Sequence, residues 1–414
     1  MAKTRAGLIA AVDIGTTKVA CFVARANGAG GIRVTGVGHH AANGMRAGMI
    51  VDMEAAQASI LTAVTAAEQL SNERLSKVFV NISGGRFASK TMGVEVSIAG
   101  HEVGESDLAR ILGHGRPKGE AQDQELIHCI PTGYSIDGSN GIRDPRGMFG
   151  ETLAVNMHLV TASTAALRNL ATCVARCHLD IETVVVSPYA AGLAVLVEDE
   201  MDLGATLVDM GGGTTTIAVF YDGNVIYTDS IPTGGVNVTK DIARGLSTPI
   251  VHAERMKTLY GSAMAAPTDE RELIDVPLVG EENQSHANHV PRSVLTGIIR
   301  PRIEETFELV RDRLENSGVS RHAGRRLVLT GGASQLQGIP ELAALILEKQ
   351  VRIGRPLRTG GLADATSGPA FATCAGMLRY AIEKFEQSHD FGGRAAEMPI
   401  GPISRFSQWL RENF

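Results

Sequence analysis

Short apolar runs separated by a glycine-bearing turn open the chain. Residues 8–12 and 19–24 are apolar, and they flank Asp13-Ile14-Gly15-Thr16-Thr17. This order predicts a β-hairpin. The pattern that follows predicts a strand over residues 32–38, a helix over residues 53–70 that Asp52 caps, and a buried strand over residues 77–82.

The same order returns in the second half. The turn Asp209-Met210-Gly211-Gly212-Gly213-Thr214-Thr215 lies between apolar residues 205–208 and β-prone residues 216–221. The two copies predict a duplicated α/β domain with a cleft between its halves. Further expected elements are a strand at 224–231, helices at 235–245, 248–260 and 293–316, and a strand at 326–329 that runs into Thr330-Gly331-Gly332-Ala333-Ser334.

Residues 83–161 interrupt the first copy with frequent glycines and charges. We expect an inserted small α+β module there, with short strands and one helix over residues 106–112. Residues 265–289 are polar and acidic, which predicts a loop-rich stretch. Between these segments the pattern predicts a helix at 163–176, a strand at 181–186 and a helix at 189–197.

Composition narrows the class of protein. The 414 residues include 39 Lys and Arg against 45 Asp and Glu, a formal net charge of −6, which disfavours a nucleic-acid-binding protein. No apolar run approaches the roughly 20 residues of a membrane-spanning helix, and the N-terminus lacks the pattern of a signal peptide. Five scattered Cys suit free thiols in a reducing compartment, so we expect a soluble cytoplasmic protein.

The two glycine turns carry the groups that a polyphosphate needs. Unobstructed backbone N–H groups and hydroxyls can bind phosphate oxygens, and a nearby carboxylate can hold Mg²⁺ through its water shell. A single turn of this kind is equally explained as an ordinary hairpin. Two matched turns plus the Gly331-Gly332 turn favour a nucleotide site in which Asp13 and Asp209 face the metal.

The order of these motifs resembles the actin-like ATPases, a superfamily that includes actin, sugar kinases and MreB. The resemblance implies ATP and Mg²⁺ as ligands and two RNase H-like lobes joined by connecting helices near Ser187-Pro188-Tyr189 and Gly368-Pro369-Ala370. A surface ion pair is the competing interpretation of Glu254 and Lys257. The nucleotide-binding residues that the resemblance to the actin-like ATPases implies are Asp13, Gly15, Thr16, Thr17, Lys18, Asp209, Gly211, Gly212, Gly213, Thr214, Gly235, Lys240, Glu254, Lys257, Gly331, Gly332 and Ala333.

The inserted segment narrows the resemblance. Residues 130–138 and 141–150, with Asp144-Pro145-Arg146-Gly147 among them, closely resemble the FtsA family of cell-division proteins. That resemblance implies that the inserted segment is a module called 1C, through which other division proteins bind. It also implies that the protein forms filaments and lies on the cytoplasmic face of the inner membrane at the division site. It also implies that subdomain 2B receives the FtsZ C-terminal peptide, and Arg300 and Arg302 are candidates for binding it. The alternative is that these two arginines only form a solvated helix end.

The expected division of the chain follows from this resemblance. It consists of lobe 1A at 1–82 and 163–197, module 1C at 83–162, lobe 2A at 198–236 and 326–385 with a return helix to 1A, subdomain 2B at 237–325, a flexible tether at 386–401 and an amphipathic helix at 402–414.

The last residues predict a membrane anchor. At about 100° per residue, one face of a helix over 402–414 is apolar, and Trp favours the interface between lipid and water. Docking of this helix on the protein body or on a partner is the alternative. The residues of the apolar face are Ile403, Phe406, Trp409, Leu410 and Phe414.

Hydrolysis and rival functions complete the expectations. Several relatives carry Glu or Gln where this chain has Ser187, a weak water-positioning residue, so we expect ATP binding with slow or conditional hydrolysis. One alternative is an adaptor similar to PilM of type IV pilus assembly, and a remoter one is a phosphotransferase of the sugar kinase class.

Overall fold

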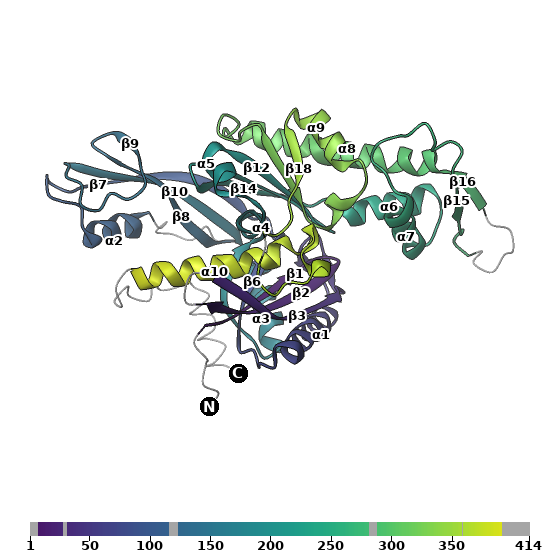
Figure 1. Ribbon diagram of the computed structural model, residues 1–414, viewed down its shortest axis with the longest axis horizontal. Coiled ribbons are helices and arrows are strands. Elements are labelled where there is room, and N and C mark those ends of the chain that lie inside the picture. Colours follow the sequence, from purple (N-terminus) through teal and green to yellow (C-terminus); the bar gives the residue numbers. More distant parts are fainter. Residues whose placement is uncertain (1–6, 28–30, 116–122, 281–287, 358, 391–414) are drawn as a thin grey trace.

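Two similar lobes, a module on one side and a subdomain on the other make up the computed structural model (Figure 1). The structure describes residues 7–27, 31–115, 123–280, 288–357 and 359–390. The expected amphipathic helix with Ile403, Phe406, Trp409, Leu410 and Phe414 therefore lies outside the described residues, as does most of the tether.

Lobe 1 is built on a five-stranded sheet in the order β11-β6-β1-β2-β3. The strands β1 to β3 are antiparallel, and β6 and β11 extend the sheet in parallel. Its elements are β1 (Leu8–Ile14), β2 (Lys18–Asn27), β3 (Gly31–Ala41), the short hairpin β4 (Met45–Arg46) and β5 (Met49–Ile50), α1 (Met53–Ser71), β6 (Lys77–Ile82), α3 (Thr164–Arg176), β11 (Asp180–Val186) and α4 (Ser187–Val195).

Lobe 2 repeats this sheet in the order β14-β13-β12-β17-β18, with the same directions. The predicted duplication is therefore confirmed strand by strand. Its elements are α5 (Glu198–Leu203), β12 (Ala205–Met210), β13 (Thr215–Tyr221), β14 (Asn224–Ile231), β17 (Arg326–Thr330), η1 (Gly332–Gln335), α9 (Ile339–Leu347), β18 (Gln350–Ile353), η2 (Asp364–Thr366), η3 (Pro369–Phe371) and α10 (Ala372–Asp390).

Local signals set the bounds of α1. The Asp52 carboxylate accepts hydrogen bonds from the N–H groups of Glu54 and Ala55, each at 3.1 Å, and so caps the helix as predicted. The helix buries an alanine-rich face against β3. A side chain at Gly38 would overlap the Ala63 carbonyl, so glycine allows the helix to lie close to the strand.

The connecting helices α4 and α10 cross between the two sheets (Figure 1). Helix α4 packs on lobe 2 and α10 on lobe 1, and their side chains share one buried apolar cluster with both sheets. At the crossing, a side chain at Gly376 would overlap the Ala190 carbonyl. Glycine at this position therefore allows the two helices to cross closely.

The inserted module is a four-stranded sheet in the order β7-β10-β8-β9 with one helix on one face. The expectation of short strands was wrong, since β8 and β10 run for 13 and 12 residues. The helix is close to its prediction. The elements are β7 (Ala88–Ser97), α2 (Glu105–His114), β8 (Gln124–Ile136), β9 (Ser139–Ile142) and β10 (Thr152–Ser163).

The module also contacts lobe 2. Ser89 Oγ donates to the Thr228 carbonyl at 2.8 Å and accepts from the Thr228 N–H at 3.0 Å. Arg143, in the loop after β9, pairs with Asp202 at 3.2 Å and with Asp222 at 3.1 Å. The module thus belongs to lobe 1 by sequence and touches lobe 2 in space.

The subdomain beyond lobe 2 is mostly helical. Residues 265–289 were expected to be loop-rich, but part of this stretch pairs with the residues that follow it in a two-stranded hairpin. The expectation was therefore wrong in part. The hairpin has only four residues in each strand, and only Ile274 and Val276 of it are buried, so it leaves little apolar pattern in the sequence. The elements are α6 (Gly235–Gly245), α7 (Ile250–Tyr260), β15 (Leu273–Val276), β16 (Asn288–Pro291) and α8 (Arg292–Asn316).

Candidate nucleotide site

The two predicted turns meet at their tips between the lobes. Each turn is closed by one hydrogen bond, from Gly15 N–H to the Lys18 carbonyl at 2.9 Å and from Gly211 N–H to the Thr214 carbonyl at 2.8 Å. Side chains at Gly212 and Gly213 would overlap Thr17 and Thr16 of the opposite turn. Glycine is therefore required where the two phosphate loops, residues 15–17 and 211–214, touch.

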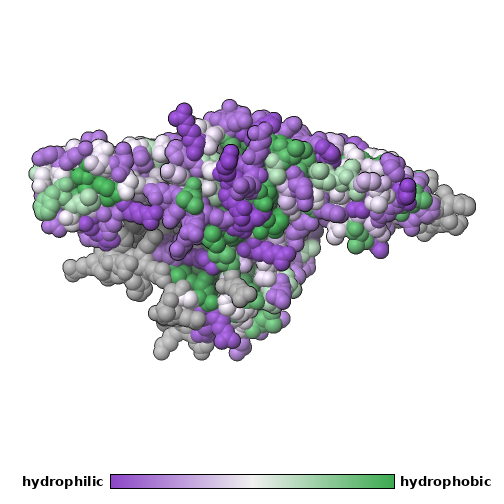
Figure 2. Space-filling model, turned by 45° about the horizontal axis from the view of Figure 1, so that its top comes forward, coloured by the Kyte–Doolittle hydropathy of each residue, from purple (hydrophilic) through white to green (hydrophobic). Residues whose placement is uncertain are grey.

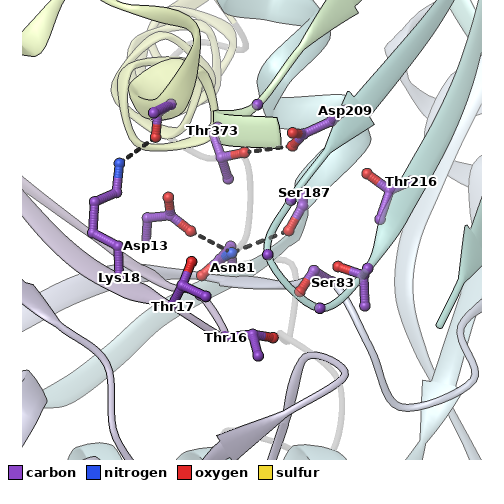
Figure 3. A pocket seen from close by; sticks show the side chains of 18 of the residues that line it. Asp13, Thr16, Thr17, Lys18, Asn81, Ser83, Ser187, Asp209, Thr216 and Thr373 are labelled. Atoms are coloured by element: carbon purple, nitrogen blue, oxygen red, sulfur yellow. Dashed lines mark hydrogen bonds between the residues drawn. The ribbon is translucent and has the colours of Figure 1, made fainter. Parts of the chain in front are cut away.

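A pocket of about 170 Å³ lies behind this contact (Figure 3). Both lobes contribute to it, together with the segment that begins the second connecting helix. Its lining residues are Asp13, Gly15, Thr16, Thr17, Lys18, Asn81, Ser83, Ser187, Asp209, Gly211, Gly212, Gly213, Thr214, Thr216, Gly331, Gly332, Pro369, Ala370 and Thr373.

Two buried carboxylates face this pocket. Burial raises the pKa of Asp13 to about 6, although Lys18 and a hydrogen bond from Asn81 act in the opposite direction. Burial and the repulsion from Asp13 raise the pKa of Asp209 to about 7, although Thr373 donates to its Oδ2 at 3.0 Å. One small pocket thus holds two carboxylates that are costly to ionise together.

Lys18 is the cation of the pocket. Burial lowers the pKa of its ammonium group, and the carboxylates of Asp13 and Asp209 partly offset this effect. The Nζ atom donates to the Ala370 carbonyl and lies 3.5 Å from the centre of the Phe371 ring. A phosphate in the pocket would compete with the Ala370 carbonyl for this ammonium.

The pocket fits a Mg²⁺ ion with a polyphosphate. Mg²⁺ prefers carboxylate, hydroxyl and water oxygens, and it usually keeps several of its waters. Asp13 and Asp209 supply the carboxylates, and Thr214 and Thr216 add hydroxyls. A divalent cation would offset the repulsion that raises the pKa of Asp209.

Sequence reasoning missed Asn81, which organises the pocket. Its Oδ1 accepts from Ile14 N–H at 2.7 Å, and its Nδ2 donates to Asp13 Oδ1 at 2.7 Å and to Ser187 Oγ at 3.0 Å. The available signal was a single amide among the buried apolar residues of β6, at 3% exposure. Thr373, the partner of Asp209, was missed in the same way.

A residue of the inserted module contacts the backbone next to this network. His128 on β8 is fully buried, and its Nε2 accepts from the N–H of Val186 at 3.1 Å, one residue before Ser187. Burial lowers the pKa of His128 to about 3, so the ring is neutral and can accept this bond. A strand of the module thus supports the backbone at the edge of the pocket.

Four of the predicted nucleotide-binding residues, namely Gly235, Glu254, Lys257 and Ala333, lie together beside the glycine turns. A side chain at Gly235 would lie 3.2 Å from Ala333 Cβ and 3.6 Å from Lys257 Nζ. Lys257 donates to the Gly235 carbonyl at 3.1 Å and pairs with Glu254 at 2.7 Å. The competing surface ion pair therefore exists, and Lys257 also bonds the backbone of Gly235.

The double-glycine turn lies against Asp209 at the wall of the pocket. Gly331 has φ of +86° and its N–H donates to the Pro369 carbonyl at 3.2 Å. A side chain there would overlap the Asp209 carboxylate. Gly331 and Gly332 line the pocket, whereas the neighbouring Ala333 lies toward Gly235.

Three predicted residues lie away from the pocket. Lys240 lines a separate hollow, which shares only Thr16 and Gly213 with the pocket. Arg300 pairs with Glu304 at 2.7 Å, and Arg302 pairs with Asp241 at 2.5 Å and also with Glu305. A peptide carboxylate would therefore compete with existing partners of these two arginines.

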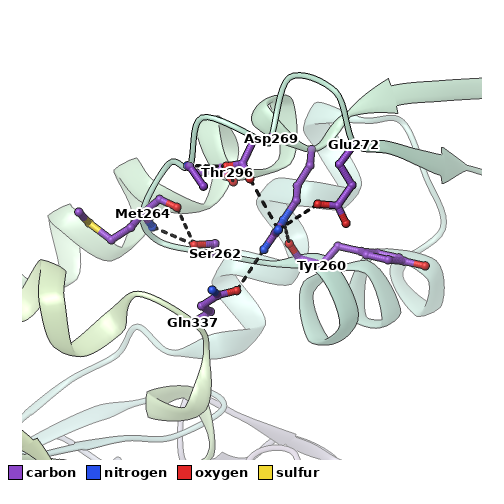
Figure 4. A network of polar contacts seen from close by, with 9 residues as sticks. Tyr260, Ser262, Met264, Asp269, Glu272, Thr296 and Gln337 are labelled. Carbon is purple, nitrogen blue, oxygen red and sulfur yellow. Dashed lines mark hydrogen bonds and ion pairs between the residues drawn. The ribbon is translucent and has the colours of Figure 1, made fainter.

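The subdomain has its own polar network (Figure 4). The Arg292 guanidinium donates to the Tyr260 carbonyl at 2.8 Å, to Glu272 at 3.0 Å and to Gln337 at 3.1 Å. It also lies 3.6 Å from the buried Asp269 carboxylate. Gln337 belongs to lobe 2, so this network fixes the subdomain to the lobe that carries it.

Comparisons with known proteins identify the relatives of the chain. Residues 206–376 match the family model described as cell division protein FtsA, and residues 84–161 match the SHS2 domain inserted in FtsA. The chain is 44% identical to the cell division protein FtsA of Rhizobium meliloti over 99% of this chain and 96% of that protein. It is 35% identical to FtsA of Pseudomonas aeruginosa over the whole of both chains.

Solved structures share the fold at lower identity. A PilM-PilN type IV pilus biogenesis complex matches with a TM-score of 0.63 and 16% identity over 90% of this chain and 98% of that chain. MreB5 of Spiroplasma citri bound to ADP matches with a TM-score of 0.57 and 14% identity over 94% and 99%. The actin-like fold that the sequence predicted is confirmed.

Proposed function

The chain belongs to the FtsA family of cell-division proteins, and from this premise we propose that it binds Mg-ATP between its lobes, polymerises, and attaches FtsZ filaments to the membrane. Its place would be the cytoplasmic face of the inner membrane at the division site.

One observation carries the nucleotide part of the proposal. Two glycine turns from duplicated lobes meet beside a pocket that holds Lys18, Asp13 and Asp209. Backbone N–H groups, one cation and two carboxylates are the chemistry that a metal-bound triphosphate needs. The raised pKa values of both carboxylates favour a site that is completed by a divalent cation.

Hydrolysis by this site would be slow. Ser187 stands at the start of the first connecting helix, at 2% exposure, and its Oγ already accepts from Asn81. A serine hydroxyl is a weak base beside the carboxylates and amides that orient water in efficient enzymes. We expect turnover well below about 1 s⁻¹, the low end for dedicated enzymes.

Membrane attachment is proposed through residues 402–414. Among the described residues, no helix has the length and apolar character that crossing a bilayer requires. An interfacial helix that buries four or five large side chains gains at most roughly 6–12 kcal/mol before the costs of association. One anchor would bind reversibly, and a filament with many anchors would gain avidity of about 10² or more.

Partner binding is proposed at both ends of the molecule. The free end of the module shows a hydrophobic patch on the face in Figure 2, and Met148 and Phe149 are 41% and 69% exposed. Such surfaces suit contacts with the next subunit or with other division proteins. For the FtsZ C-terminal peptide we propose subdomain 2B with Arg300 and Arg302. A titration of the peptide against Arg300→Ala tests this assignment, and unchanged affinity removes Arg300.

Two experiments test the function as a whole. Electron microscopy of the full chain on anionic lipid should show filaments with Mg-ATP and none without it. Flotation with liposomes should recover the full chain and leave a chain that ends at Met398 in solution. Failure of the first result refutes ATP-dependent assembly, and equal flotation of both chains refutes the anchor.

The rival functions make different predictions. A PilM-like adaptor shares the fold but would not need the last residues for lipid binding, so the flotation experiment separates the two. A sugar kinase-like phosphotransferase would transfer phosphate from ATP to sugar hydroxyls, which a screen of sugars with labelled ATP detects. The inserted module and the full-length relatives favour neither rival.

A further inference from the structure

A histidine of the inserted module lies where the two connecting helices meet. The His128 ring, on β8, packs edge-on against Tyr189 of α4, with 5.6 Å between the ring centroids, and against Tyr380 of α10 at 5.8 Å. The two tyrosine rings are 5.9 Å apart and also meet edge to face. Contacts of this geometry add to the stabilisation that burial alone gives. The His128 ring thus joins the module to both helices that connect the lobes.

The same ring binds the backbone where α4 begins. The strand β11 is at the edge of the described lobe 1 sheet, so groups on its outer side lack a neighbouring strand. Val186 ends this strand and is fully buried, so an unpaired N–H there would cost free energy. His128 Nε2 accepts this N–H at 3.1 Å, and among the described residues no side chain caps α4. The module therefore satisfies a backbone group that lobe 1 itself leaves open.

A short series of bonds leads from this contact to Asp13 (Figure 3). Ser187 directly follows Val186, and its Oγ accepts from Asn81 Nδ2 at 3.0 Å. The same Nδ2 donates to Asp13 Oδ1 at 2.7 Å. Ser187 and Asn81 are 2% and 3% exposed, so no bulk water replaces these bonds when one partner moves. A displacement of the backbone at Val186 is therefore passed to the wall of the pocket.

A second histidine of the module provides an internal comparison. His158 on β10 lies diagonally across the sheet from His128 and is also buried, at 0% exposure. Neither of its ring nitrogens has a hydrogen-bond partner among the described residues. Of these two buried rings, it is His128 that holds the start of a connecting helix.

We propose that His128 is a positioning residue of the nucleotide site, through which the inserted module keeps Ser187 and Asn81 in place for the terminal phosphate of a nucleoside triphosphate. The inference rests on the proposed nucleotide function and deepens it. Ser187 stands where the water that attacks the terminal phosphate would lie, and a nucleoside diphosphate has no phosphate there. Loss of the bond to Val186 should therefore weaken the triphosphate more than the diphosphate.

The test compares three variants of the full-length protein. His128→Leu removes the acceptor and keeps a side chain of similar size, whereas His128→Gln keeps an acceptor. His158→Leu is the matched control, because it replaces a buried ring that has no hydrogen-bond partner in the described part of the chain. Dissociation constants for fluorescent ADP and for a fluorescent non-hydrolysable ATP analogue are measured with Mg²⁺, and thermal melting shows whether each variant is folded.

The inference predicts a selective loss of affinity. His128→Leu should weaken the ATP analogue about fivefold or more, the effect of roughly one hydrogen bond, and change ADP by less than about twofold. His128→Gln and His158→Leu should stay within about twofold of the wild type for both nucleotides.

A spectroscopic measurement on the wild type does not depend on the folding of His128→Leu. In protein labelled with ¹⁵N-histidine, the Nε2 resonance of His128 is identified by its absence from His128→Gln. This resonance should shift when the ATP analogue is added and stay in place with ADP, and the His158 resonances should respond to neither nucleotide.

Other results overturn the inference. Equal loss of ADP and analogue affinity in His128→Leu, no loss in that variant, the same loss in His158→Leu or in His128→Gln, or a His128 resonance that responds alike to both nucleotides each refute the positioning role. A wild-type chain that binds neither nucleotide refutes the proposed function itself, and the inference falls with it.

Discussion

Replacement of Asp209 by Asn gives a direct test of the electrostatics in the nucleotide pocket. Burial and the nearby Asp13 carboxylate raise the pKa of Asp209 from 3.8 to about 7. The folded protein therefore binds this proton more tightly than the unfolded chain does, and the free energy of unfolding falls as pH rises from about 4 to about 7. Roughly 3 pKa units at 1.36 kcal/mol each amount to about 4 kcal/mol.

The variant should not lose this free energy of unfolding at neutral pH, because Asn does not ionise. Without nucleotide at pH 7.5, we expect it to be more stable than the wild type by up to about 4 kcal/mol, whereas at pH 4 the two should be similar. At about 2–4 °C per kcal/mol for a folding unit of roughly 150–250 residues, the melting temperature should rise by up to about 8–16 °C. The rise in melting temperature that Mg-ATP causes should be largely lost in the variant, because only one of the two carboxylates remains.

Thermal unfolding followed by circular dichroism from pH 4 to pH 8, with and without Mg-ATP, measures both effects. Asp269→Asn is a matched control, because that carboxylate is also buried, at 1% exposure, but faces Arg292 far from the pocket. It should lower the melting temperature at pH 7.5 and leave the response to Mg-ATP intact. An Asp209→Asn protein that melts below the wild type at pH 7.5, or by a margin independent of pH, would refute the reasoning.

Three further changes have separate expected outcomes. Gly213→Ala adds a methyl group that overlaps Thr16, so nucleotide affinity in a fluorescence titration should fall about tenfold or more, and wild-type affinity would contradict the tip contact. Lys257→Met removes the donor to the Gly235 carbonyl, so the free energy of unfolding in urea should fall by about 1.5–3 kcal/mol, and an unchanged value would contradict this role. Arg292→Ala should lower the free energy of unfolding in urea by about 3–5 kcal/mol with unchanged nucleotide affinity, and a loss of affinity would show that its network reaches the pocket.

The duplicated lobes could be predicted because short-range patterns encode them. Alternating strands, two glycine turns and the cap of α1 by Asp52 are local signals, and the structure has these elements within a few residues of their expected bounds. The long strands of the module were underestimated because most positions of β8 are half-buried, which blurs the alternation of apolar and polar residues.

The residues of the site could be predicted where they belong to a local sequence motif. They could not be predicted where only the fold brings separate segments together. Asn81 and Thr373 are single polar residues in apolar surroundings, and only the packing of separate elements brings them to Asp13 and Asp209. Lys240 shows the reverse problem. It lies five residues after Gly235 on α6, which is about 140° around the helix, so both cannot face one pocket.

The position of the inserted module has a mechanical consequence. Its strands continue into lobe 1, yet Ser89 and Arg143 hold it to Thr228, Asp202 and Asp222 of lobe 2. Any swing that parts the lobes must break these links or drag the module along. A protein bound to the module would therefore resist or favour separation of the lobes, and a change in that separation would in turn move the surface that the module presents.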